Sequence, residues 1–125
     1  MKIIGIGIDI LKINRLKKIL KRFKKKFIQK ILSPKEIYLY KKSKRKINFL
    51  AKRFVIKEAL CKAMGFGMRK GISFNNIEVY NNKMNKPKIN YLGNSNLKKK
   101  QLKIKKSHVS FTDEKKYAQA IVILE

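Results

Sequence analysis

The chain has 125 residues, of which 34 are lysine or arginine and only 7 are aspartate or glutamate, so its formal net charge is +27. Hydrophobic residues make up 44% and charged residues 33%, a composition typical of a folded domain rather than a disordered chain. No apolar run approaches the length of a membrane-spanning helix, and the N-terminal segment lacks a signal-peptide cleavage pattern. We therefore expect a single domain, residues 1–125, in the cytoplasm, without membrane contact.

The single cysteine, Cys61, excludes an internal disulfide, fits a reducing compartment and is interpreted as a small buried hydrophobic residue. The positive charge is spread along the whole chain, which indicates a solvated surface that favours anionic partners. A small basic RNA-binding protein is the alternative, and a structural or interaction module without chemistry is a third possibility. RNA binding would favour exposed aromatic residues among the basic ones, but most aromatic residues here keep core spacing. We expect no nucleic-acid partner.

The N-terminal region predicts one strand and two helices. Residues 3–10 alternate as a strand does, with isoleucine on one face and Ile3, Gly5, Gly7 and Asp9 on the other. The glycines let another backbone or a ligand come close to Asp9. Residues 13–30 have the apolar spacing of an amphipathic helix, with Phe23 on its apolar face. The sequence from Ser33 to Glu36 predicts a capping box that starts a short helix.

The chain is organised around a helix that we predict from Asn48, as its N-cap, to Gly65, the glycine that ends it. Helical spacing puts Glu58 on or beside a face that otherwise needs burial. A carboxylate that leaves water needs a cation, which could be Lys62 one turn on or a metal ion. A solvent-exposed Glu58–Lys62 pair is the alternative. Because the chain has so few acids, each of them is a candidate for a specific role.

The C-terminal half predicts mostly strands. We expect a glycine-rich turn over residues 65–71, strands over 73–80 and 88–92 joined by a turn, a less regular segment over 93–106 that could form a short helix, and strands over 108–112 and 117–124. Taken with the helices, this order predicts an α+β fold in which a mostly antiparallel sheet packs against a long helix.

The residues that could perform chemistry are carboxylates and cations. One histidine, His108, and one cysteine exclude a zinc site made of paired histidine or cysteine ligands. Asp9 and Glu58 are hard oxygen ligands that suit Mg²⁺ together with substrate phosphates. Arg53 and Lys62 could hold phosphate oxygens. Sequence spacing alone does not show whether Asp9 and Glu58 meet.

Three blocks carry a resemblance that covers nearly the whole chain: GIGIDI at residues 5–10, the run over residues 49–74, and HVSFTDEKKYAQAIVIL at residues 108–124. In this order they resemble the holo-[acyl-carrier-protein] synthases, the small bacterial 4′-phosphopantetheinyl transferases. The most specific part is F-x-x-K-E-A-x-x-K, from Phe54 to Lys62, combined with the early G-x-D that ends at Asp9.

The resemblance implies transfer of 4′-phosphopantetheine from coenzyme A to a serine of apo acyl carrier protein in fatty acid biosynthesis, with release of adenosine 3′,5′-bisphosphate. It also implies a requirement for Mg²⁺ and a homotrimer with active sites between subunits. Carried over to matching positions, it implies that Asp9 and Glu58 hold the ion and that Lys62 faces the diphosphate, the three being the catalytic residues. The implied coenzyme-binding residues are Arg53, Lys62, Pro87 and Ser110, and the implied carrier-binding residues are Arg15 and Arg22.

The sequence departs from the family pattern at three positions. The usual Gly-Lys-Pro turn is Asn85-Lys86-Pro87 here, and we expect the turn to survive because asparagine tolerates positive φ. Lys12 stands where the family is often acidic. Asp113 stands where the family often has histidine, which puts a coenzyme contact from that hairpin in doubt.

Overall fold

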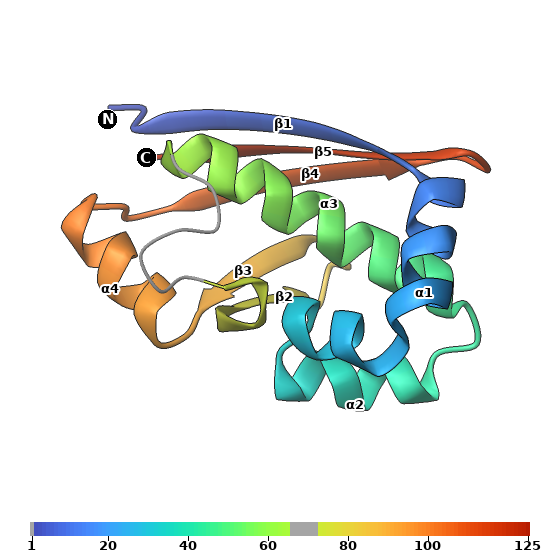
Figure 1. Ribbon diagram of the computed structural model, residues 1–125. Helices are drawn as coiled ribbons and strands as arrows, with labels where there is room; N and C mark the ends of the chain where they lie inside the picture. Colours follow the sequence, from blue (N-terminus) through green and yellow to red (C-terminus); the bar gives the residue numbers. More distant parts are fainter. Residues whose placement is uncertain (1, 66–72) are drawn as a thin grey trace.

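The computed structural model describes residues 2–65 and 73–125. Most of the predicted glycine-rich turn falls on residues 66–72 and so lies outside the described residues. In chain order the elements are β1 (Gly5–Lys12), α1 (Ile13–Ile31), α2 (Pro34–Lys42), α3 (Lys46–Met64), the 3₁₀ turn η1 (Phe74–Asn76), β2 (Ile77–Asn81), β3 (Pro87–Tyr91), α4 (Asn94–Gln101), β4 (Ser107–Asp113) and β5 (Tyr117–Leu124) (Figure 1). The predicted α+β class is confirmed.

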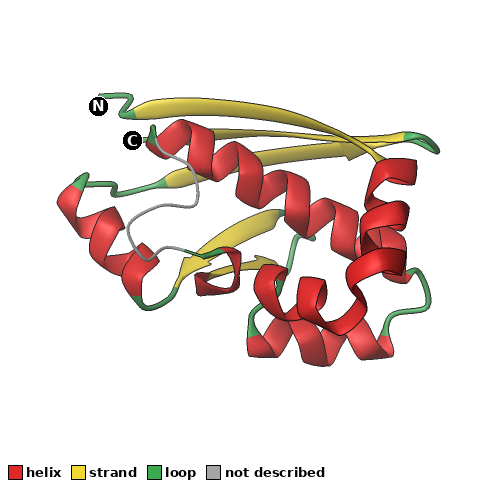
Figure 2. Cartoon of the chain, in the orientation of Figure 1, coloured by secondary structure: helices red, strands yellow, loops and turns green. Residues whose placement is uncertain are grey.

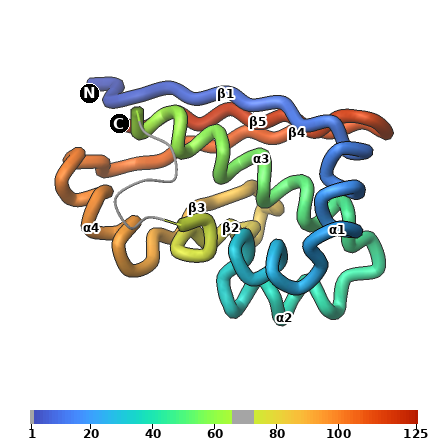
Figure 3. The backbone as a smooth tube through the Cα atoms, in the orientation of Figure 1, coloured from blue at the N-terminus to red at the C-terminus, as the bar shows by residue number. Residues whose placement is uncertain are grey.

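The strands form two antiparallel sheets that both contact α3, and β3 of the smaller sheet lies beside β4 of the larger one (Figures 1 and 2). The larger sheet has the order β1-β5-β4, and β1 pairs with β5 along its whole length, from Gly5 opposite Leu124 to Lys12 opposite Tyr117. The smaller sheet is the β2–β3 hairpin. Helices α1 and α2 lie together at one end of α3, and α4 lies toward the other end, as the backbone tube in Figure 3 shows.

The glycine face of β1 is the buried face. A Cβ atom on Gly5 would lie 1.8 Å from the carbonyl oxygen of Ala63, and one on Gly7 would lie 1.9 Å from that of Ala59. Only glycine allows β1 to come so close to the α3 backbone. The opposite face of β1 carries the isoleucines, and its side chains at positions 6, 8 and 10 are 52–61% exposed. Bulky aliphatic residues therefore lie outside and glycines inside.

Helix α3 supplies the centre of the core. It begins at Lys46 with Arg45 as its N-cap, so the prediction of Asn48 as the N-cap is wrong. It ends as predicted at Gly65, whose φ of 85° is the left-handed conformation that glycine adopts readily. Cys61 is buried as predicted, and burial raises the pKa of its thiol to about 12, so the thiol stays protonated and unreactive at neutral pH.

Helix α1 is kinked where the sequence predicted a continuous helix. Lys24 has a φ of 46°, which divides the helix into two segments. Phe23, expected on the apolar face, is 49% exposed because the kink follows it directly. The capping box from Ser33 to Glu36 is confirmed. None of the described helices combines the length and apolar character that a bilayer span requires.

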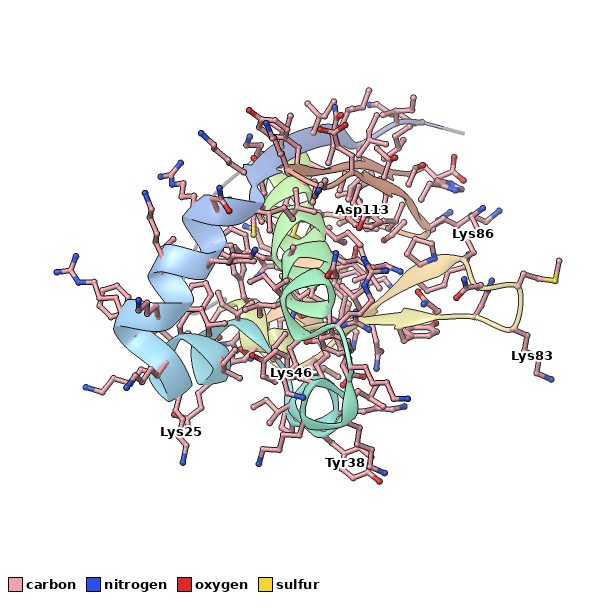
Figure 4. The ribbon with its side chains drawn as sticks, turned by 90° about the vertical axis from the view of Figure 1, so that its right-hand side faces the viewer. Lys25, Tyr38, Lys46, Lys83, Lys86 and Asp113 are labelled. Carbon is pink, nitrogen blue, oxygen red and sulfur yellow. The ribbon has the colours of Figure 1, made fainter. Side chains whose placement is uncertain are left out.

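The hairpin region follows the prediction except at its start. The strand predicted from residue 73 begins at Ile77, because Phe74 to Asn76 form the 3₁₀ turn. Asn85 has a φ of 61°, so asparagine takes the positive-φ position of the β2–β3 turn as expected. Side chains at the tip of this turn extend into solvent, as Lys83 does in Figure 4.

Candidate active site

Asp9 lies on the glycine face of β1 and is held against α3 by Lys62. The Lys62 ammonium donates to Asp9 Oδ1 at 2.8 Å and to the Ile8 carbonyl oxygen at 3.1 Å. The Lys62 side chain is 55% exposed, so this ion pair lies at the surface, where a substrate could reach it. Lys62 therefore forms its ion pair with Asp9. The alternative, a surface pair of Glu58 with Lys62, is not what the structure shows.

Glu58 is half-buried on α3, one turn before Lys62. Burial raises the pKa of its carboxyl group, the nearby negative charge of Asp9 raises it further, and Lys62 lowers it. The two acids are thus close enough to interact although 48 residues separate them in the sequence. Within residues 2–65 and 73–125, the Glu58 carboxylate has no hydrogen bond and no ion pair. A half-buried carboxylate that makes no hydrogen bond to the described residues, beside a second carboxylate, favours a bound cation.

The donor set fits Mg²⁺ better than a transition metal. The described residues contain no group of three or more histidine, cysteine, aspartate or glutamate side chains that could enclose a metal ion. Two carboxylates are what Mg²⁺ commonly takes from a protein when substrate phosphates and water complete its coordination. Asp9 and Glu58 are therefore the residues that could hold such an ion, with Lys62 placed to contact a phosphate.

The sequence did not indicate that Lys57 is buried. Its side chain is fully buried, and its ammonium donates to Glu36 Oε1 at 2.5 Å, to the Ile31 carbonyl at 2.6 Å and to the Phe74 carbonyl at 3.0 Å. Burial lowers the pKa of this ammonium, and the Glu36 carboxylate counteracts the effect. The one available signal was the lysine of the K-E-A motif, which pattern alone does not separate from a surface lysine.

Arg53 lies in the same buried region rather than with the carboxylates. It is 6% exposed, its Nε atom lies 3.6 Å from Glu36 Oε2, and its guanidinium carbon lies 3.5 Å from the centre of the Phe49 ring. The structure does not bring Arg53 to the cluster of Asp9, Glu58 and Lys62. Its assignment to coenzyme A stays a prediction.

Ser110 and Pro87 also lie apart from the cluster. Ser110 pairs with Ile121 on the outer face of the larger sheet, opposite the face that carries Asp9. Pro87 begins β3 in the smaller sheet, opposite Asn81. Both remain predicted coenzyme-binding residues.

Asp113, the residue predicted to stand where the family often has histidine, ends β4 (Figure 4). It lies near Lys52 of α3. Burial lowers the pKa of the Lys52 ammonium, and the negative charge of Asp113 raises it. The position thus carries a negative charge next to a lysine, which differs from what a histidine would offer an anionic ligand.

Arg15 and Arg22 are both exposed on the first segment of α1, before the kink at Lys24. Residues seven apart on a continuous helix share a face, so the two guanidinium groups project from one side. The Arg22 guanidinium lies 5.2 Å from the centre of the exposed Phe23 ring. This side of α1 therefore combines positive charge with one aromatic side chain.

Comparison with known proteins decides the family. Residues 5–122 match the model of the 4′-phosphopantetheinyl transferase superfamily. The chain belongs to this superfamily. The matched span includes β1 with Asp9, the whole of α3 and nearly all of β5, so the elements that build the candidate site lie within the matched region. The resemblance found in the sequence is confirmed, and the chain is an enzyme of the phosphopantetheinyl transferase class.

Individual relatives agree with this assignment. The chain is 51% identical over 125 residues to the holo-[acyl-carrier-protein] synthase of Buchnera aphidicola subsp. Schizaphis graminum, covering all of this chain and 99% of the relative. The crystal structure of the enzyme of that name from Neisseria meningitidis has a TM-score of 0.92 at 35% identity, covering 99% of both chains. The Helicobacter pylori enzyme, solved in complex with coenzyme A, has a TM-score of 0.83 at 37% identity, covering 96% of this chain and 99% of that one.

Proposed function

We propose that this enzyme transfers the 4′-phosphopantetheine group of coenzyme A to a serine of apo acyl carrier protein, in the cytoplasm, and releases adenosine 3′,5′-bisphosphate. The observation that carries the proposal is the meeting of Asp9, Glu58 and Lys62 at the contact between β1 and α3. Holo-[acyl-carrier-protein] synthases with known structures keep this fold, and one of them binds coenzyme A. The relatives' names give no support to the RNA-binding alternative.

Mg²⁺ bound by Asp9 and Glu58 would neutralise negative charge on the diphosphate of coenzyme A. Lys62 is placed to hold a phosphate oxygen, because its ammonium is half exposed and already faces the Asp9 carboxylate. Glu58 is the candidate base that accepts the proton of the carrier's serine hydroxyl, directly or through a water molecule. Burial helps in this role, since it raises the pKa of the Glu58 carboxyl and makes its carboxylate a stronger base.

The direct test is to incubate the protein with apo acyl carrier protein, coenzyme A and Mg²⁺ and to weigh the carrier by mass spectrometry. The expected result is a carrier heavier by one phosphopantetheine group, with formation of adenosine 3′,5′-bisphosphate and dependence on Mg²⁺. An unmodified carrier, with RNA bound tightly instead, would overturn the proposal in favour of the RNA-binding alternative.

We propose further that the active protein is a homotrimer joined through the outer face of the larger sheet. Exposed isoleucines of β1 lie beside Ile121 and Ile123 of β5, and none of the described helices covers them (Figure 1). A contiguous exposed apolar patch of this kind marks an interaction site. Ser110 lies in the same face, next to a hollow of about 280 Å³ lined in part by Ile8 and Thr112. A site shared between copies would let Ser110 serve coenzyme A although it is on the far side of its own sheet.

Ile8→Asp should therefore break the assembly, because it places a charge at the centre of the exposed isoleucine row. Sedimentation should show smaller species than the unchanged protein, and carrier modification should fall by roughly 10-fold or more if sites are shared. Leu97→Asp on α4 is the matched control, since Leu97 is an exposed aliphatic residue away from this sheet. A fully active monomeric form of the unchanged protein would rule out shared sites.

The carrier is proposed to dock on the first segment of α1 through Arg15 and Arg22. Charge reversal of both to glutamate should raise the KM for carrier by roughly 10-fold or more, since complementary charges act on encounter and orientation. It should leave coenzyme A binding nearly unchanged, because the proposed phosphate contact is Lys62. Raising the salt concentration should reduce the difference between the variant and the unchanged protein.

The high overall charge makes a matched control necessary for this test. Reversing Lys100 and Lys105, which are exposed and lie far from α1, changes the net charge by the same amount. If both double variants weaken carrier turnover equally, attraction is diffuse and α1 is not the docking site.

A further inference from the structure

A fully buried ion pair joins four elements of the fold. Lys57 of α3 contacts Glu36 of α2, and we call these two residues the buried pair. The Lys57 ammonium also donates to the carbonyl of Ile31, the last residue of α1, and to that of Phe74. Glu36 in turn accepts the backbone N–H of Val79 in β2 at 3.0 Å. The pair therefore links the end of α1 to α2, α3 and β2.

The bonds of the buried pair are directional. Apart from the two members themselves, the hydrogen-bond partners of these two side chains are fixed backbone atoms, and Arg53 adds an ion-pair contact to Glu36 at 3.6 Å. Lys57 directly precedes Glu58, so the two side chains leave α3 about 100° apart around the helix axis. Any rotation of α3 that released Lys57 from Ile31 would also turn Glu58 relative to Asp9. The pair thus fixes the orientation of Glu58 and the position of α1 at the same time.

Stability alone does not account for such a pair. Two charges lose their hydration on burial, and apolar side chains of similar volume often stabilise a core equally well. Neighbouring residues of α3 are apolar and fully buried, with Val55, Ile56 and Leu60 at 0% exposure, so apolar side chains in place of both members of the pair would suit such a core. What the pair adds is a defined position for the end of α1.

We propose that Lys57 and Glu36 are positioning residues that hold α1 at a fixed place relative to Glu58 and Lys62. A carrier bound to α1 is thereby presented with its serine at the reacting phosphate. The inference rests on the proposed docking of the carrier on α1. It extends the site to two residues that contact neither the cluster nor the proposed docking arginines.

The test compares Lys57→Met with Ile56→Ala, the preceding residue of α3, which is equally buried but apolar. Both changes should lower the melting temperature by about 10 °C or more, one by breaking a buried pair and the other by leaving a cavity. Kinetics are then measured well below both melting temperatures. Lys57→Met should lower kcat/KM for carrier by roughly 10-fold while coenzyme A binding changes less than about 2-fold, and Ile56→Ala should change both only slightly. Glu36→Gln is the milder variant if Lys57→Met fails to fold.

Hydrogen exchange of the backbone amides tests, without any carrier present, whether the buried pair holds the end of α1. The last turn of α1 should exchange faster in Lys57→Met than in Ile56→Ala, because only the first change removes the hydrogen bond to the Ile31 carbonyl. Equal exchange in the two variants would show that the buried pair does not hold the end of α1, whatever charge reversal at Arg15 and Arg22 does to carrier binding. Faster exchange combined with equal losses of carrier kcat/KM in the two variants overturns the positioning role, whereas an unaffected KM in the arginine variant overturns only the docking site.

Discussion

Replacing Asp9 or Glu58 by alanine is expected to lower the rate of carrier modification by roughly 100-fold or more, in line with losing several kcal/mol of charge stabilisation at the reacting phosphate. Each change removes one of the two neighbouring carboxylates, Asp9 of β1 and Glu58 of α3, whose charges influence each other. The remaining single carboxylate should bind Mg²⁺ more weakly. The measurement is the initial rate of carrier modification over a range of Mg²⁺ concentrations.

The fold of both variants should persist, because neither acid belongs to the buried core. Melting temperatures close to that of the unchanged protein would establish this. Glu114→Ala is the control, since it removes an exposed acid in the turn between β4 and β5. Near-normal turnover of either site variant at limiting Mg²⁺ would show that the metal site lies elsewhere.

Gly7→Ala is expected to damage both stability and activity through one methyl group. The added Cβ would lie 1.9 Å from the carbonyl oxygen of Ala59 and 2.6 Å from the amide nitrogen of Ala63. Both are backbone atoms of α3, which cannot rotate away from the new methyl group as a side chain can, so β1 has to move outward. Forcing a methyl group into a packed contact costs about 1–3 kcal/mol or more. Asp9, two residues on, would move away from Glu58, and we expect a loss of activity of roughly 100-fold.

Gly65→Ala separates the loss of stability from the displacement of Asp9. A Cβ at Gly65 meets nothing within 4 Å, but the residue has a φ of 85°, so alanine is strained there by about 1 kcal/mol. Calorimetry and carrier kinetics on both variants decide the matter. Activity of Gly7→Ala equal to that of Gly65→Ala, at temperatures where both are folded, would show that the close approach of β1 serves stability alone.

The sequence predicted the order of elements well because its local signals were strong. Alternation in β1, the capping box at Ser33 and the glycine at the end of α3 are each determined by residues close together in the chain. Alternation does not say which face of a strand is buried, however. Isoleucine would ordinarily be the buried side of β1, yet the close packing of α3 reserves that side for glycine.

Contacts between residues far apart in the chain could not be predicted from the sequence. Asp9 and Glu58 could be singled out as acids in a basic chain, but their proximity depends on how β1 lies on α3. Lys57 and Arg53 read as two of many basic residues, although both end buried against Glu36. No proline or glycine marks the kink at Lys24 in the sequence, which is why Phe23 was expected in the core.

The pairing of β1 with β5 has a consequence for how the enzyme is made. The two strands lie at opposite ends of the described chain, and Gly5 pairs with Leu124. During synthesis β1 leaves the ribosome well before its partner strand β5 has been made. Contacts so far apart in sequence close slowly, and an unpaired isoleucine-rich strand is open to pairing with other chains in the meantime. Asp9 lies on that strand, so we expect the candidate active site to reach its final geometry only after β5 has paired with β1.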